Sequence, residues 1–258
     1  MTHPTPNLSH ESDRVLNRTG IGMSPVQGGE MLKGIADPLL STPSSAGDEQ
    51  QLEQVRRAYA SQAEPLGSMP PPSSLKGIAK TALALLKGRQ PTVLLDKLGE
   101  RLAFERTGSR LYEALLAKHD ALGTWEGGPS RAALASIHDD ELRHFHLLTA
   151  VIESLGADPT VMTPSADLVA VEATGLLQVL TDPRTNLLQA LHAILVAELA
   201  DRDGWQALVD LTRVLGMDEL ARQFQAALVD EEGHLTKVRS WVTLTTEQLA
   251  QGDLRTVS

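Results

Sequence analysis

Two stretches of the chain place a glutamate three residues before a histidine, an arrangement that can bind a metal ion. Glu141 precedes His144 in one stretch, and Glu231 precedes His234 in the other. Residues three apart lie on the same face of a helix, so both side chains of a pair can reach one point. Carboxylate oxygen and imidazole nitrogen are together typical ligands of iron and manganese. Either pair alone would be weak evidence, because glutamate is common on helix surfaces.

Two further glutamates, Glu105 and Glu198, strengthen this prediction. Each precedes one of the Glu-x-x-His pairs by a similar number of residues, so the chain looks like an internal duplication. All four glutamates fall within apolar stripes of helical spacing, where an ionised carboxylate is costly unless it is paired or bound to a metal. The predicted metal ligands are Glu105, Glu141, His144, Glu198, Glu231 and His234.

The charges of these ligands indicate two metal ions. Four carboxylates carry a charge of about −4 and two neutral imidazoles carry none, so two divalent cations would neutralise the group. A single ion would leave two buried negative charges uncompensated. We expect two iron ions, with two manganese ions as the alternative, because zinc rarely binds this many carboxylates.

Four long helices are expected to position these ligands. Apolar residues recur at steps of three and four, the spacing of one buried helix face, over residues 91–123, 130–156, 185–216 and 218–250. Short loops join the first helix to the second and the third to the fourth, which predicts antiparallel neighbours. About thirty residues, with one short helix near 168–180, join the second to the third. The predicted fold is all-α: an antiparallel four-helix bundle with one long crossover between helices two and three, which is the ferritin-like topology.

The remaining residues differ in composition from this bundle at 91–250. Residues 1–75 hold nine of the fourteen prolines and one aromatic residue, Tyr59. We therefore expect an N-terminal extension that is largely irregular or disordered, apart from a short helix at 48–62. Residues 76–90 are expected to form a short helical lead-in, and residues 251–258 a tail.

Three stretches, FERTGSRLYEALL, HDDELRHFHLL and VDEEGHL, resemble helices of the ferritin-like superfamily, particularly its bacterioferritin, rubrerythrin and manganese-catalase branches. The resemblance extends over residues 92–249. It implies oxygen or peroxide chemistry at a di-metal centre in which Glu141 and Glu231 bridge the two metals. The terminal ligands would be Glu105 with His144 and Glu198 with His234. The chain has no CxxC pair, so it lacks the electron donor of a rubrerythrin.

Three classes of function are compatible with a helical bundle that holds two metal ions. The favoured one is a di-iron protein that reacts with O2 or H2O2, as a ferroxidase in iron handling or as an oxidoreductase. The second is peroxide dismutation like that of a manganese catalase, and the third is a non-enzymatic iron-storage or structural bundle. No residue is assigned a catalytic role and no organic cofactor is predicted. We expect a homo-oligomer, a dimer by default, and a separate electron donor if the site cycles between oxidation states.

Composition narrows the remaining choices. The chain has no cysteine, which excludes disulfides and thiolate metal sites. Its net charge of −10 disfavours nucleic acid and anionic membranes as partners. No apolar run is long enough to span a bilayer, and the polar start MTHPTPNLSH does not resemble a secretory signal. We expect a cytoplasmic protein without a membrane partner.

Several polar residues lie next to the predicted ligands in the sequence. Four acidic residues beside the bridging glutamates are expected on a solvated face: Asp139, Asp140, Asp230 and Glu232. His138 could hold a carboxylate near the metals or lie on the surface, and Tyr112 could donate a hydrogen bond or an electron or simply pack in the core. Asp201 and Arg202 could form a buried pair that steadies a ligand, or a polar end of the site. Three histidines are expected on the surface, His119, His146 and His192, and three tryptophans are expected in packing or loop positions, Trp125, Trp205 and Trp241.

Overall fold

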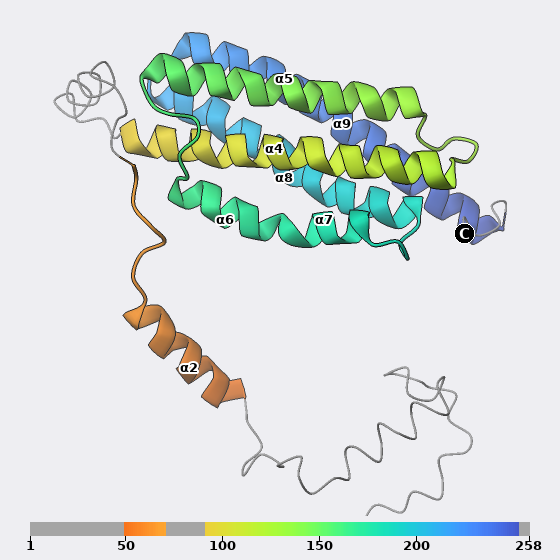
Figure 1. The fold of residues 1–258 in the computed structure, drawn as a ribbon, viewed down its shortest axis with the longest axis horizontal. Helices are drawn as coiled ribbons and strands as arrows, with labels where there is room; N and C mark the ends of the chain where they lie inside the picture. The colour runs from red at the N-terminus through yellow and green to blue at the C-terminus, as the bar shows by residue number, and fades with distance from the viewer. Residues whose placement is uncertain (1–48, 71–90, 253–258) are drawn as a thin grey trace, which may run out of the picture. The chain divides into compact units, whose positions relative to one another are not determined.

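The computed structural model describes residues 49–70 and 91–252 (Figure 1). Contacts divide the chain into two units, Met1–Glu64 and Pro65–Ser258. In the first unit the described residues form one helix, α2 (Glu49–Gln62), which confirms the short helix expected at 48–62. None of its residues is buried, so α2 forms no hydrophobic core. The remaining expectations for 1–48, the lead-in at 76–90 and residues 253–258 of the tail fall outside the described residues.

The regular secondary structure in the described part of the second unit is all helical, and neither unit contains a strand among the described residues. Four long helices appear where the apolar spacing predicts them, with two short helices in the crossover. In chain order the helices are α4 (Pro91–Leu122), α5 (Arg131–Leu155), α6 (Pro164–Glu172), α7 (Thr174–Thr181), α8 (Leu187–Val214) and α9 (Asp218–Gln251). The all-α prediction is therefore confirmed for the described residues.

The four long helices pack side by side. Helix α4 contacts α5 and α8, and α9 contacts the same two helices, so each long helix has two long neighbours. Figure 1 shows α4 and α5 running in opposite directions, and α8 and α9 likewise. Both pairs are joined by short loops, as antiparallel neighbours require. The segment from α5 to α8 carries α6 and α7, both of which lie against α4.

Local side chains define where these helices begin and end. The Ser130 hydroxyl accepts a hydrogen bond from the Ala133 backbone N–H at the start of α5, and Gly156 ends that helix with a φ of 86°. This left-handed conformation is readily adopted only by glycine. At the start of α8, Asn186 and Gln189 exchange side-chain and backbone hydrogen bonds in a capping box.

The crossover differs from the prediction of one helix near 168–180. It contains two short helices, and the first begins earlier because the Thr163 side chain caps it and Pro164 occupies its first turn. The two are separated at Ala173. Next to that break, the Thr174 hydroxyl donates a hydrogen bond to the Ala170 carbonyl oxygen. The hydroxyl thereby competes with the backbone N–H of Thr174 for the same acceptor. The start of α6 is attached to α4 through Asp96, whose carboxylate accepts hydrogen bonds from Ser165.

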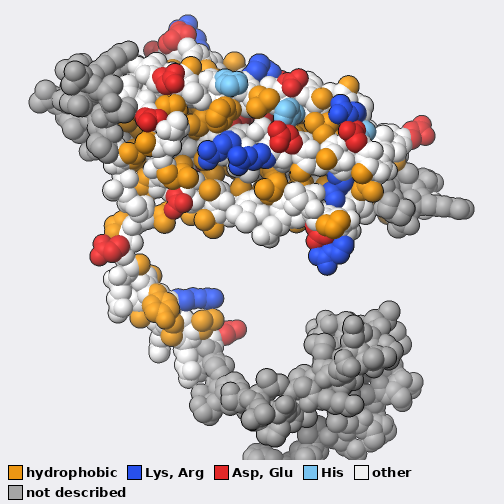
Figure 2. All heavy atoms as spheres, viewed as in Figure 1, with side chains coloured by type: hydrophobic (Ala, Val, Ile, Leu, Met, Phe, Trp, Pro, Cys, Tyr) orange, Lys and Arg blue, Asp and Glu red, His pale blue; other side chains and the backbone are white. Residues whose placement is uncertain are grey.

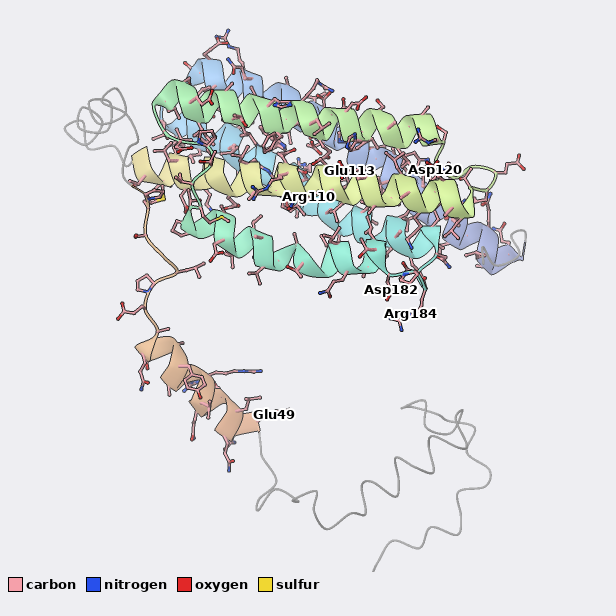
Figure 3. The ribbon with its side chains drawn as sticks, in the orientation of Figure 1. Glu49, Arg110, Glu113, Asp120, Asp182 and Arg184 are labelled. Carbon is pink, nitrogen blue, oxygen red and sulfur yellow. The ribbon has the colours of Figure 1, made fainter. Side chains whose placement is uncertain are left out.

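The surface of the second unit carries mixed charge. Acidic and basic side chains are interspersed on the face drawn in Figure 2. Near the ends of the helices, Asp120 pairs with Arg131 at 2.9 Å and Asp182 pairs with Arg184 at 2.6 Å; three of these four residues are labelled in Figure 3. No helix in the described ranges combines the length and apolar character that crossing a bilayer would take.

Two apolar clusters fill the space between the long helices. One is built around Leu115, Ile137 and Ile194, and the other around Leu98, Leu148 and Leu208. On α5, α8 and α9 the two clusters lie on opposite sides of the glutamate that the sequence singles out, and on α4 only Ala103 and Phe104 depart from this division. Buried polar side chains therefore form a layer between two apolar cores, and this layer holds the candidate site.

Candidate metal centre

The structure brings all six predicted ligands to one place. Glu105 comes from α4, Glu141 and His144 from α5, Glu198 from α8, and Glu231 and His234 from α9. None of the six is more than 3% exposed. They form two groups whose ligand atoms lie within 4.8 Å of one another: Glu105, His144 and Glu231 in the first, and Glu141, Glu198 and His234 in the second.

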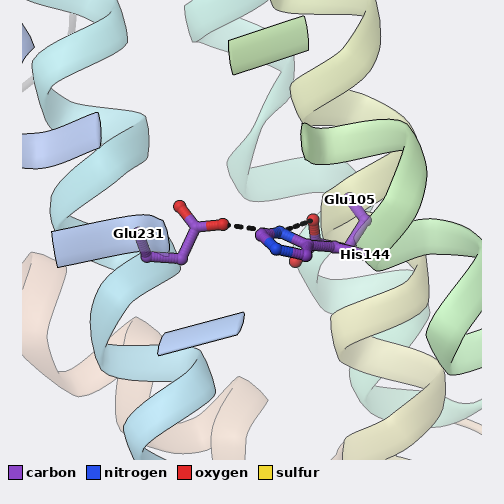
Figure 4. A group of neighbouring side chains, drawn as sticks. All are labelled: Glu105, His144 and Glu231. Carbon is purple, nitrogen blue, oxygen red and sulfur yellow. Dashed lines mark ion pairs between the residues drawn. The ribbon is translucent and has the colours of Figure 1, made fainter. Parts of the chain in front are cut away.

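The first group surrounds the Nδ1 atom of His144 (Figure 4). This nitrogen lies 2.7 Å from Glu231 Oε1 and 3.7 Å from Glu105 Oε2. The carboxylates come from α4 and α9, so the group joins both helical hairpins. Ligand atoms from three helices thus meet at one point between the hairpins.

The second group surrounds the Nδ1 atom of His234 in the same way. This nitrogen lies 3.2 Å from Glu231 Oε2, 3.9 Å from Glu141 Oε1 and 4.0 Å from Glu198 Oε2. Glu231 therefore directs one oxygen toward each histidine. Glu141 is also within 4.8 Å of Glu105, so it too reaches both groups.

Three buried carboxylate oxygens of these residues have no hydrogen-bond partner: Glu105 Oε2, Glu141 Oε2 and Glu198 Oε2. Other ligand atoms are paired, because His144 Nδ1 lies 2.7 Å from Glu231 Oε1 and Arg101 Nε lies 3.2 Å from Glu105 Oε1. Buried polar atoms are ordinarily hydrogen-bonded, and those left unpaired require an explanation such as an ion. The donor set, carboxylate oxygen with imidazole nitrogen, has the chemistry of a site for iron or manganese. The residues present thus fit a pair of such ions.

The crowding of carboxylates perturbs their protonation. Burial, followed by repulsion from neighbouring carboxylates, raises the pKa of Glu141 well above its ordinary value and that of Glu198 to about 8. Burial acts in the same direction on Glu231, but His144 and His234 lower the pKa of that carboxyl to about 2. Without cations the group cannot ionise fully, because like charges at this separation repel strongly in a buried site.

Asp140 and Asp230 both reach the candidate site, which the prediction of a solvated face did not include; the Asp140 side chain is 19% exposed and that of Asp230 is 40% exposed. Asp140 Oδ2 lies 2.9 Å from His234 Nε2, and Asp230 Oδ2 lies 3.4 Å from His144 Nε2. Each aspartate thus reaches the outer nitrogen of the histidine on the neighbouring helix. Arg143 contacts both carboxylates and closes a chain of charged groups between α5 and α9.

A buried arginine, Arg101, lies beside the site, and the sequence analysis did not predict a role for it. Arg101 Nε lies 3.2 Å from Glu105 Oε1, and its Nη2 lies 3.1 Å from Asp201 Oδ1. The partner of Asp201 is therefore Arg101 and not Arg202, which is half-buried and pairs with Asp203. The two partners lie on different helices far apart in the chain, so no local spacing in the sequence indicates the pair.

The expected solvent exposure is found for the remaining acidic neighbours. The Asp139 side chain is 76% exposed and that of Glu232 is 52% exposed. His138 contacts Glu113 and Asp139, both outside the six ligands. These contacts favour the surface role for His138. Among the other histidines, His146 and His192 are exposed as predicted. The surface prediction is wrong for His119, whose side chain is 11% exposed and whose Nε2 lies 3.2 Å from the Pro129 carbonyl oxygen.

Aromatic residues contact a ligand in each half of the site. The Tyr112 hydroxyl donates a hydrogen bond to Glu198 Oε1. Burial, with the charge of Glu198, raises the pKa of Tyr112 well above its ordinary value, so the phenol stays neutral and remains a donor. Trp205 is fully buried, and its ring lies edge-on to His144 with 5.3 Å between ring centroids.

Two glycines leave room for charged groups of the site. A Cβ atom on Gly108 would overlap the Glu141 carboxylate, and one on Gly204 would overlap the Arg101 guanidinium. Both are helical positions, where alanine would otherwise be preferred by about 1 kcal/mol. Their small size is therefore a requirement of the site, although neither stands out in the sequence.

Comparison of the chain with models of protein families, with curated proteins and with solved structures finds no match. The case for any function therefore depends on the geometry of these buried groups.

Proposed function

We propose that this chain is a ferritin-like di-metal carboxylate protein that binds two iron ions and reacts with O2 or H2O2. One observation carries the proposal: two groups of buried carboxylates and histidines contain carboxylate oxygens that have no hydrogen-bond partner, and Glu231 of the first group also contacts His234 of the second. The arrangement of α4, α5, α8 and α9, with a long crossover between the two hairpins, supports the ferritin-like topology.

The protein would hold each ion with one histidine and several carboxylates. Glu105 and His144 would serve one ion, and Glu198 and His234 the other. Glu231 directs an oxygen to each histidine and would bridge the pair; Glu141 reaches both groups and would do the same.

The two aspartates behind the histidines fix how the imidazoles bind. Asp140 would accept a hydrogen bond from Nε2–H of His234, and Asp230 lies close enough to Nε2 of His144 to orient that ring. With the proton held on Nε2, the lone pair of Nδ1 faces the site, as a metal ligand requires.

A bound di-iron pair would supply the electrons and the open coordination position for reducing O2 or H2O2. The chain supplies an enclosed site. Apolar clusters border the polar layer on both sides and exclude water from it. Tyr112 donates to Glu198 and keeps that carboxylate oriented.

The test is metal content combined with oxidation. Anaerobic loading of the purified chain with Fe(II), followed by removal of unbound metal, is expected to leave about two irons per chain by elemental analysis. Admission of air should then oxidise them, as followed by ultraviolet–visible absorption. A chain that retains no iron would contradict the proposal, whereas preferential retention of manganese with H2O2 dismutation would support the manganese-catalase alternative.

Two histidines on α5 provide a matched comparison. His144 is buried in the site, while His146, two residues further on, is exposed. We expect His144→Ala to lose stoichiometric iron while remaining helical by circular dichroism, and His146→Ala to behave like the parent. Equal loss in both variants would indicate that the iron binds elsewhere.

A further inference from the structure

A third group of acidic residues lies beside the two that form the candidate centre. Ligand atoms of Glu105, Glu141 and Asp201 are also within 4.8 Å of one another. All three residues are buried, and Asp201 is 2% exposed. By residue type and spacing this group resembles a further cation site, yet the six ligands already account for two ions.

The guanidinium of Arg101 lies against two members of this group. Its nitrogens lie 3.2 Å from Glu105 Oε1 and 3.1 Å from Asp201 Oδ1, and Nη1 donates to the Asp201 backbone carbonyl oxygen at 3.3 Å. The atoms around the guanidinium are thus carboxylate and carbonyl oxygens, the ligands that hard divalent cations prefer. The side chain also stacks on Phe104 at 4.2 Å from the ring centroid, which fixes its position.

The surrounding backbone leaves space for this arginine. Gly204 lies against Nη1, and a Cβ atom there would overlap the guanidinium. Arginine stays protonated at any physiological pH, so its charge is a permanent feature of the site. The Arg101 side chain is 5% exposed, and water therefore screens that charge little.

Charge counting assigns Arg101 a specific effect. Five buried carboxylates carry about −5, and the guanidinium returns the total to about −4, which two divalent ions balance. Without the arginine, the fifth carboxylate would be left without a cation. A buried, uncompensated carboxylate either takes up a proton or binds an ion.

We propose that Arg101 takes the place of a third divalent cation between Glu105 and Asp201, and so limits the centre to two ions. This inference rests on the proposed function, because it presumes that the six ligands bind two metals. It adds that the metal count is set by a residue outside the ligand set. Arg101 is accordingly a positioning and charge-balancing residue.

The experiment counts Mn²⁺ ions bound by the full-length chain. Equilibrium dialysis with elemental analysis, in excess Mg²⁺ to occupy weak surface sites, is expected to give two Mn²⁺ per chain for the parent and three for Arg101→Met. Arg101→Lys keeps a positive charge and should stay at two. In Arg101→Met/Asp201→Asn, loss of the Asp201 carboxylate should return the count from three to two.

These variants separate failure of the inference from failure of the proposed function. A parent chain that binds no Mn²⁺ and no Fe²⁺ refutes the proposed function, and the inference with it. A parent that binds two ions while folded Arg101→Met also binds two overturns the inference alone. If Arg101→Met does not fold, Arg101→Gln provides the same loss of charge with a polar side chain, and its count decides in the same way.

Discussion

The hydrogen bond from His234 to Asp140 allows the clearest test of how the site is held. Replacing Asp140 by Asn keeps the size of the side chain but removes its charge. An asparagine can present its NH2 group to Nε2 of His234, which would force the imidazole proton onto Nδ1. A protonated Nδ1 cannot bind a metal, so part of the binding free energy would be lost.

The size of the loss follows from the geometry. Removing such a partner of a ligating histidine weakens metal binding by roughly 10–100-fold, which corresponds to about 1.4–2.7 kcal/mol. Asp140 Oδ2 lies 2.9 Å from the imidazole and its side chain is 19% exposed. Asp230 Oδ2 lies 3.4 Å from His144 and its side chain is 40% exposed. We therefore expect a loss near the upper limit for Asp140→Asn and near the lower limit for Asp230→Asn.

The assay is competition for Mn²⁺ between the protein and a fluorescent chelator, which reports affinity without turnover. Asp139→Asn is the matched control, because Asp139 adjoins Asp140 but its side chain is 76% exposed and contacts His138. Metal affinity should fall in the order parent and Asp139→Asn, then Asp230→Asn, then Asp140→Asn. If Asp140→Asn and Asp139→Asn bind Mn²⁺ equally well, the outer hydrogen bond does not support the ligand and the reasoning is wrong.

Further predictions concern protons, space and stability. Burial opposes a charge on His144, yet Glu105 and Glu231 raise its pKa to about 10, while burial and Glu231 raise that of Glu198 to about 8. Both groups therefore carry a proton at pH 7 in the metal-free protein. Metal binding at pH 7 should release at least these protons, and the affinity for metal should rise between pH 6 and 8. Calorimetry in buffers of different ionisation enthalpy measures the proton release. Metal binding without proton release would contradict the proposal that these residues are ligands. Gly108→Ala should cost the site at least one ion while leaving the helices intact by circular dichroism, because its Cβ would displace the Glu141 carboxylate. Free metal at 100 times the dissociation constant should stabilise the fold by about 2.7 kcal/mol per site, and a chelator should reverse the rise in melting temperature.

The helices and the shared faces of the candidate ligands could be predicted because both depend on local spacing. Ser130 and Gly156 define the ends of α5 through contacts within a few residues. The three-residue step from Glu141 to His144 is likewise a property of one helix, so their common face needs no knowledge of the fold. Because each pair lies near the middle of its helix, packing of the helices side by side brings the two pairs together.

The supporting residues could not be predicted because they depend on how helices meet. Asp140 lies one residue before a ligand and is therefore turned by about 100° around its helix, a position that suggests solvent until the neighbouring helix is placed. Arg101 and Asp201 lie 100 residues apart in sequence, on α4 and α8. Their pairing is a property of the contact between these helices, and a single sequence carries no signal for it.

Internal symmetry extends beyond the ligands to the aromatic residues. Tyr112 follows Glu105 by seven residues, and Trp205 follows Glu198 by the same number. Tyr112 donates to Glu198, and Trp205 lies edge-on to His144, so each aromatic contacts a ligand from the other half. The two halves therefore support each other through equivalent positions.

Two buried positions near the lone glutamates differ between the halves, and this difference would distinguish the two proposed ion positions. Four residues before the lone glutamate stands Arg101 in the first half but Ile194 in the second; three residues after it stands Gly108 in the first half but Asp201 in the second. Arg101 and Asp201 meet across the bundle beside Glu105. The small Gly108 accommodates the Glu141 carboxylate instead. One proposed ion position therefore adjoins a buried charge pair, whereas the equivalent position of the other half has an apolar side chain there. Candidate ligands of the same type thus lie in different electrostatic environments, because the residues that differ lie one helical turn away from them.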